Sequence, residues 1–352
     1  MKKYYLIFSI FFFLFLEGCN RNNEPEKLPI SVKSNLALLQ DKPQFVMYMN
    51  FKQMRQTAYW KENVSDSILN AERTFGNILN TFKTATGASI SDGLDELYFS
   101  NAWLGENTIV LKGVFDRNKT ESFLSTDTNF KKVTRPSGAS VFRHNENSLY
   151  FFFKDNFTIC SSNYLNRIDD MMTVTDTSKT GLLNNESMMN AINEAMFKEQ
   201  LWMVSTEKTF IRGMLMNFIE PKGRQSSGIT EQDSTLAKDS LTKAEDLVIN
   251  NLYKYINSIS FSGKMKKELV LNVNLVCVDS KSADYTGKLI NGMITLAKFG
   301  SAVNKNKQPA ATDKILENIN VVINNNSVQV EIGIDKNNID DFRKNTMLKK
   351  PN

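Results

Sequence analysis

The chain repeatedly changes from a short β-rich run to an amphipathic helix pattern, and a small polar residue marks each change. Three such junctions are Val114-Phe115-Asp116, Cys277-Val278-Asp279 and Gly333-Ile334-Asp335. Aspartate at this position accepts hydrogen bonds from the first free backbone N–H groups of a helix. Side chains alternate between the two faces of a strand but recur every three to four residues on a helix. The repeated change of period therefore predicts an α+β fold.

Most of the predicted strands come in neighbouring pairs, which indicates antiparallel sheets covered by amphipathic helices. Residues 256–262 and 269–278 form one predicted hairpin, and residues 319–323 and 328–334 form another. The span from Phe99 to Asp116 nearly matches the span from Phe261 to Asp279. One interpretation is a weak internal repeat of a ββα unit. The other is that strand, cap and helix follow one another in any α+β protein.

The interior of the chain contains one segment without a hydrophobic period, at residues 220–240, with Pro221, Gly223 and Gly228. Such a segment favours a boundary between two units. We therefore expect an N-terminal lobe at 35–219, a linker at 220–240, a C-terminal lobe at 241–344 and a tail at 345–352. The alternative is one continuous sheet that both lobes share.

The N-terminus carries the pattern of an export signal. Lys2 and Lys3 precede an apolar run from Tyr4 to Leu16, which is shorter than the ~20 residues that a membrane-spanning helix needs. The run ends in Leu16-Glu17-Gly18-Cys19, which resembles the lipobox of bacterial lipoproteins. The resemblance implies removal of a signal peptide at 1–18, palmitate or similar acyl chains on Cys19, and attachment to a membrane through this lipid. Residues 19–34 are then a polar tether.

The body of the chain is similar to envelope lipoproteins of the Bacteroides–Flavobacterium group. The resemblance rests on the lipobox, on an early strand after a Lys/Pro turn (residues 39–48) and on the repeated ββα elements. It implies a lipid-anchored protein of the cell envelope, with the outer membrane favoured and with other envelope proteins as partners, but no particular activity. Asp-Ser-apolar and Asp-Ser-Thr triplets also resemble O-glycosylation sites of that group, which makes Ser67, Ser234 and Ser240 predicted sites.

Charge and composition argue against several classes of ligand. The formal net charge of +5 is spread over 352 residues without a basic stripe, so nucleic-acid binding is not favoured. Once Cys19 is lipidated, Cys160 and Cys277 remain, and we expect buried thiols in strands or, alternatively, a disulfide. The single histidine, His144, is expected at the edge of a hairpin rather than as a catalytic base. One histidine and two separated cysteines predict no metal site, and no motif predicts a cofactor.

One set of residues resembles a catalytic signature. Ser205-Thr206-Glu207-Lys208 fits S-x-x-K and Lys179-Thr180-Gly181 fits K-T-G, as in penicillin-binding proteins and serine β-lactamases. Their order along the chain is the reverse of the order in that family. We therefore interpret Ser205 as a helix cap, and catalytic activity is not favoured.

Methionines are frequent in the predicted helices of the N-terminal lobe. Flexible thioethers adapt to apolar ligands, so these residues could line a groove for a lipid, although ordinary core packing at helical spacing is the favoured explanation. Three hypotheses remain: a non-enzymatic binding or assembly component, a carrier of an apolar ligand, and an enzyme without a recognisable motif. The methionines that would line the groove are Met171, Met172, Met188, Met196 and Met214.

Overall fold

The computed structural model describes nine ranges of the chain: residues 28–63, 73–135, 138–146, 148–175, 180–195, 199–219, 252–303, 315–335 and 337–338. Within these ranges the chain combines helices with a large antiparallel sheet, so the α+β prediction is confirmed. None of the helices in these ranges is both long and apolar enough to cross a membrane. The predicted signal peptide, Cys19 and the predicted linker lie outside the described residues.

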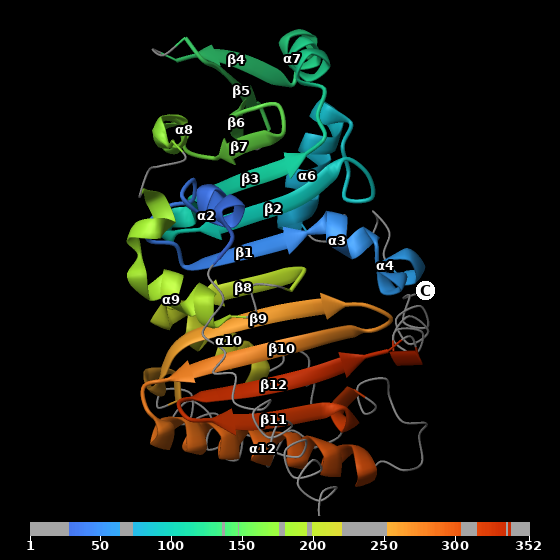
Figure 1. The fold of residues 1–352 in the computed structure, drawn as a ribbon, viewed down its shortest axis with the longest axis vertical. Helices are drawn as coiled ribbons and strands as arrows, with labels where there is room; N and C mark the ends of the chain where they lie inside the picture. Colours follow the sequence, from blue (N-terminus) through green and yellow to red (C-terminus); the bar gives the residue numbers. More distant parts are fainter. Residues whose placement is uncertain are drawn as a thin grey trace, which may run out of the picture.

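Twelve strands of the described chain form one sheet in the order β11-β12-β10-β9-β8-β1-β2-β3-β7-β6-β5-β4 (Figure 1). Neighbouring strands are antiparallel throughout. The strands are β1 Phe45–Asn50, β2 Leu94–Asn101, β3 Asn107–Gly113, β4 Phe130–Thr134, β5 Ser140–His144, β6 Tyr150–Phe153, β7 Thr158–Ser162, β8 Leu201–Ser205, β9 Ile256–Met265, β10 Leu269–Cys277, β11 Ile319–Asn324 and β12 Ser327–Ile334.

The centre of the sheet joins strands that are distant in sequence. β1 pairs with β8, with Met47 opposite Met203, and β8 pairs in turn with β9, with Met203 opposite Phe261. β8 precedes the predicted boundary at 220–240 and β9 follows it. The sheet is therefore continuous across that boundary.

The faces of the sheet differ along one row of neighbouring residues. We call the face that bears Tyr48 the front face, because Tyr48 shares a buried cluster with Leu36 of α2, the helix that lies in front of the strands in Figure 1. The front row is apolar as far as β8 and polar beyond it, whereas the matching row on the back face stays almost entirely apolar. The front row runs Cys160, Val110, Tyr98, Tyr48, Trp202, Ser262, Asn272, Glu331, Asn320, and the back row runs Ile159, Leu111, Leu97, Met49, Leu201, Gly263, Leu271, Ile332, Ile319.

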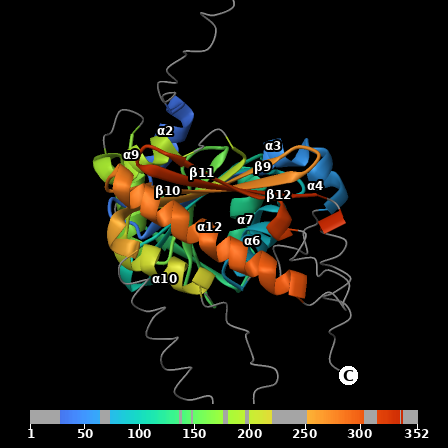
Figure 2. The same ribbon diagram turned by 90° about the horizontal axis from the view of Figure 1, so that it is seen from below.

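Helices cover the apolar parts of both faces. Figure 2 shows α2 and α9 on one side of the strands and α6 and α10 on the other. Three clusters of buried apolar residues fill the contacts between helices and sheet. They are a front-face cluster that includes Tyr48, Tyr98 and Trp202, a back-face cluster that includes Phe82, Leu97 and Leu111, and a C-terminal cluster that includes Ile211, Ile259 and Cys277. The helices are α2 Ile30–Leu36, α3 Phe51–Arg55, α4 Ala58–Asn63, α6 Arg73–Thr86, α7 Arg117–Thr126, α8 Leu165–Thr173, α9 Glu186–Glu194, α10 Lys208–Ile219 and α12 Ser280–Val303, and the 3-10 turns are η2 Trp103–Gly105, η3 Gly181–Asn184 and η4 Tyr253–Tyr255.

The predicted caps account for where several helices begin. Asp116 accepts a hydrogen bond from the backbone N–H of Lys119, and Asp279 accepts one from that of Ser282. The predicted hairpins are also present, as β9–β10 and β11–β12. Strand β4 was not predicted, because its sequence Phe-Lys-Lys-Val-Thr has an exposed pair of lysines where a strand with one buried face would alternate.

Candidate functional site: a polar hollow beside His144

A half-open hollow lies between α6 and the β4–β5 hairpin, and it has a volume of about 470 Å³. This volume falls within the range of about 300–1,000 Å³ that is usual for small-molecule sites. Polar side chains supply most of the lining. The lining residues are Asn80, Thr81 and Thr84 from α6, Asn129 and Phe130 at the start of β4, and His144 and Glu146 at the end of β5.

The packing of α6 explains why polar side chains meet there. Phe82 and Ala85 are buried in the cluster on the back face, and Leu79 packs against that cluster. Asn80 and Thr84 are one helical turn apart and exposed, so they lie on the side of α6 that this packing leaves free. α6 therefore presents an amide and a hydroxyl group to the hollow.

His144 reaches the hollow through strand pairing. It lies opposite Phe130 in the β4–β5 ladder, and the two rings meet edge to face with centroids 5.0 Å apart. The His144 Nδ1 atom is buried, yet it has no hydrogen-bond partner among the described groups. A buried polar atom without a partner costs about 1–3 kcal/mol. The hollow that His144 lines offers space where a ligand atom could satisfy this nitrogen.

The lining favours recognition over proton transfer. Amide and hydroxyl groups, which Asn80, Asn129, Thr81 and Thr84 provide, donate and accept hydrogen bonds without changing protonation state near neutral pH. Glu146 brings a carboxylate from an exposed position, and none of the described lining residues is lysine or arginine. The arrangement is therefore suited to holding an uncharged polar molecule.

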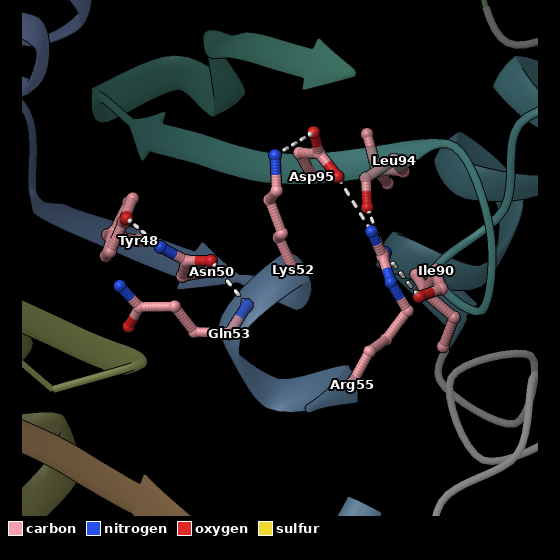
Figure 3. Close-up of polar contacts among 8 residues, drawn as sticks. All are labelled: Tyr48, Asn50, Lys52, Gln53, Arg55, Ile90, Leu94 and Asp95. Carbon is pink, nitrogen blue, oxygen red and sulfur yellow. Dashed lines mark hydrogen bonds and ion pairs between the residues drawn. The ribbon is translucent and has the colours of Figure 1, made fainter. Parts of the chain in front are cut away.

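A second polar cluster lies where β1 passes into α3 (Figure 3). Asn50 caps α3 by accepting a hydrogen bond from the backbone N–H of Gln53 at 2.9 Å, and its amide donates to the Tyr48 hydroxyl at 3.0 Å. Arg55 donates to the carbonyl oxygens of Ile90 and Leu94. These contacts fix α3 against the sheet.

The same cluster contains two cations beside one carboxylate. Arg55 Nη2 lies 2.7 Å from Asp95 Oδ1, whereas Lys52 Nζ lies 3.6 Å from Asp95 Oδ2 and is largely exposed. Arg55 and Lys52 share the Asp95 carboxylate, and the Arg55 guanidinium also donates to two backbone carbonyls. The cluster therefore has a structural role.

Two tyrosines of the front face are protonated to unusually high pH. Burial raises the pKa of Tyr48 and Tyr98, and the nearby Glu96 charge raises both further. The Tyr98 hydroxyl donates to Glu96 Oε2 at 2.9 Å, and the two tyrosine rings lie 4.9 Å apart. Neither hydroxyl is poised as a base near neutral pH.

The methionines predicted to line an apolar groove are divided among different environments. Met171 and Met188 are fully buried in the front-face cluster, and Met172 packs partly buried against it. Met214 lies on α10, a helix whose Ile211 and Leu215 belong to the separate C-terminal cluster. Met196 is outside the described residues. Three of the four described methionines of this set thus share the front-face cluster, and Met214 lies on a different helix.

The two described cysteines are free and buried. Cys160 belongs to the front-face cluster and Cys277 to the C-terminal cluster, so the alternative of buried thiols is confirmed over a disulfide. Burial raises the pKa of the Cys160 thiol to about 12. Burial also raises the pKa of Cys277.

The residues of the S-x-x-K match have structural roles. The Ser205 hydroxyl donates to the carbonyl of Gln44 at 2.5 Å and accepts from the backbone N–H of Glu207 at 3.1 Å. Lys208 donates to the carbonyl oxygen of Ile256. Ser205 thus shapes the turn from β8 into α10, in line with the interpretation as a cap. Lys179, Ser67, Ser234 and Ser240 lie outside the described residues.

Sequence reasoning placed His144 at a hairpin edge, and the structure confirms this position at the end of β5. It missed the hollow, because α6 and β4 are separated from His144 in sequence and nothing local links them. A usable signal was present in the polar pair Asn80 and Thr84, which lie one helical turn apart beside the apolar stripe of α6. Among the described residues, no group of three or more histidine, cysteine or acidic side chains could hold a metal ion.

Comparison with known proteins identifies no family. No family model matches the chain, and no curated protein sequence does. Crystal form III of a protein designated TP0453 is similar over 86% of this chain and 95% of that one, with 10% identity and a TM-score of 0.49. Crystal form IV covers 90% and 96%, with 9% identity and a TM-score of 0.44. None of these similarities assigns a function.

Proposed function

We propose that this chain is a lipid-anchored protein of the cell envelope that acts by binding a ligand in the hollow beside His144. One observation carries the binding role: His144 lines an open, polar hollow, and its buried Nδ1 atom has no hydrogen-bond partner among the described groups. The lipobox-like Leu16-Glu17-Gly18-Cys19 supports the anchor. Two or three acyl chains hold a protein at a membrane far more firmly than one, since each buried methylene contributes ~0.8 kcal/mol.

The anchor is tested by metabolic labelling. Cells that express the full chain with labelled palmitate should incorporate the label and deposit the protein in the envelope fraction, with the outer membrane favoured. The Cys19→Ser chain should take up no label and lose its membrane association. Equal fractionation of the two chains would disprove the lipid anchor.

The binding role is tested with His144 itself as the reporter. The chain has one histidine, so isotope-labelled histidine gives a single imidazole signal in an NMR spectrum. Small neutral, cationic, anionic and apolar fragments are added in turn. We expect some of them to shift this signal in the parent chain and in an Asn166→Leu control on the exposed side of α8, but not in Asn80→Leu, which narrows the hollow. A signal that no fragment shifts would refute the binding role.

We further infer that the sheet consists of two related halves that meet at β1 and β8, as the predicted ββα repeat requires. Each half begins with a central strand, continues outward through a two-stranded hairpin (β2–β3 or β9–β10), and adds strands after a helix (α7 or α12). A protease site introduced at 220–240 tests whether the halves are separate lobes. Because β8 pairs with β9, the cleaved pieces should elute together, and their separation would favour independent lobes.

A further inference from the structure

The hollow beside His144 also indicates which class of molecule it takes, and this step rests on the proposed binding role. The neutral imidazole ring exists in two tautomers, so Nδ1 either donates or accepts a hydrogen bond. A hydroxyl group can do both. It can therefore satisfy the buried Nδ1 of His144 in either tautomer, whereas a carboxylate or an ammonium group suits only one.

The other polar groups of the lining match the same ligand chemistry. The amides of Asn80 and Asn129 each offer donors and an acceptor, and the hydroxyl of Thr84 does the same at a single atom. They come from α6 on one side and from the start of β4 on the other, so they approach a ligand from two directions. A ring that bears several hydroxyl groups can pair with both sides at once.

The charge of the lining argues against ionic ligands. Glu146 is the one acidic side chain among the described lining residues, and none of them is a lysine or arginine. A bound phosphate or carboxylate would therefore meet repulsion without a compensating cation. Glu146 is exposed, so it is a weak attractor for a cation. A neutral ligand avoids both difficulties.

One wall of the hollow is apolar. Phe130 lines it while packing against Phe151 and His144, so its ring is held in place rather than free to rotate away. A sugar ring presents C–H groups on its faces and hydroxyl groups around its rim, which complements one aromatic wall among amides and hydroxyls. The hollow is open to solvent on one side, so the remainder of a longer glycan can extend outward.

From these four observations we propose that the hollow beside His144 binds a neutral sugar, through its hydroxyl groups. Sites that hydrogen-bond hydroxyl groups discriminate strongly against analogues that lack them, because their own buried polar atoms are then left unpaired. Binding should therefore depend on ligand hydroxyls and on Asn80, and little on charge.

The test uses the full chain and the single His144 imidazole signal. Methyl glucoside, methyl galactoside and N-acetylglucosamine are titrated beside glucuronate, as an anionic sugar, and cyclohexanol, as a ring with one hydroxyl. We expect at least one neutral sugar to shift the signal with a dissociation constant about tenfold or more below those of glucuronate and cyclohexanol. Asn80→Leu should abolish the shift, and Asn166→Leu should keep it.

The outcomes separate the sugar class from the binding role. If charged or apolar fragments shift the His144 signal and no neutral sugar does, the sugar class is wrong while the binding role stands. If nothing shifts it, both are wrong. A sugar that shifts the signal equally in Asn80→Leu would also overturn the assignment, because it would bind elsewhere. A disaccharide that binds more tightly than its monosaccharide would indicate a glycan chain as the source rather than a free sugar.

Discussion

The two halves of the sheet differ in whether one or both of their faces are apolar and covered by helices. In β1, β2, β3 and β7 both faces are apolar and both are covered, so consecutive residues such as Val110 and Leu111 are each fully buried. From β9 to β12 the back face is apolar and packs against α10 and α12, while the front face bears polar residues such as Asn272 and Glu331. Figure 1 shows no described helix in front of β10, β12 and β11. A strand buried on both faces reads as a continuous apolar run, and a strand buried on one face alternates.

This difference also locates the candidate site. The hollow lies in the half that contains β1, at the β4 edge of the sheet. There α6 lies beside the β4–β5 hairpin. Phe130 is held in place there by the back-face cluster, and His144 by its contact with the Phe130 ring. The front face of the other half instead bears polar residues on neighbouring strands, such as Asn272 and Glu331.

The largest expected effect on the free energy of unfolding comes from placing asparagine in the front row of one half and valine in the front row of the other. Val110→Asn buries an unpaired amide and removes apolar contact, so the free energy of unfolding should fall by about 3–5 kcal/mol. Asn272→Val, on the uncovered part of that row, should change it by less than about 0.5 kcal/mol. Urea denaturation followed by circular dichroism measures both. Similar losses in the two variants would show that the front face of the C-terminal half is also packed.

A smaller effect should separate the helices that follow the two central strands. Arg55 of α3 donates hydrogen bonds to two backbone carbonyls and to Asp95, whereas Lys208 of α10 donates one to the carbonyl of Ile256. Arg55→Met should lower the free energy of unfolding by about 1–3 kcal/mol, and Lys208→Met by less. Lys52→Met, at an exposed cation, is the matched control and should stay within about 0.5 kcal/mol. A Lys52→Met loss as large as that of Arg55→Met would contradict this account of Figure 3.

Alkaline pH should weaken the half that is covered on both faces. Burial raises the pKa of Tyr98 above its usual 10.0 and that of Cys160 from 9.0 to about 12. The folded chain therefore keeps protons that the unfolded chain loses, so stability is full below about pH 9 and falls as the pH rises further. The melting temperature between pH 8 and 11 measures this, and Tyr98→Phe should flatten the decline. An equal slope in Tyr98→Phe would remove Tyr98 as a cause.

The smallest expected effect is a difference in thiol labelling, which compares local opening of the halves. In a chain with Cys19→Ser, Cys160 reports on the front-face cluster and Cys277 on the smaller described cluster beneath α10 and α12. Cys277 should react with a thiol reagent several-fold faster, because fewer described apolar side chains must separate to expose it. Chains that also carry Cys160→Ser or Cys277→Ser assign the two rates. Equal rates would indicate that the two halves open as one unit.

Local patterns were sufficient to predict many elements. Asp116 and Asp279 were recognised as caps because a cap bonds to backbone only a few residues away. The β9–β10 hairpin was recognised because its strands adjoin in sequence. By contrast, β4 was missed, and so was the pairing of β1 with β8, because Met47 and Met203 are opposite each other only after the intervening chain has folded. Of the methionines predicted to line a groove, Met171, Met172 and Met188 share the front-face cluster, but helical spacing alone does not say which helices meet.

The sequence by itself determined the fold class and the starts of helices such as α7 and α12, since each depends on hydrogen bonds or apolar periods within short stretches of chain. The tertiary structure alone decided the order of the twelve strands, which face is covered in each half, and the meeting of Asn80, Phe130 and His144 around one hollow. The physical reason is that burial and pairing depend on which distant segments come together. A lone polar residue such as His144 acquires a role only from the neighbours that folding gives it.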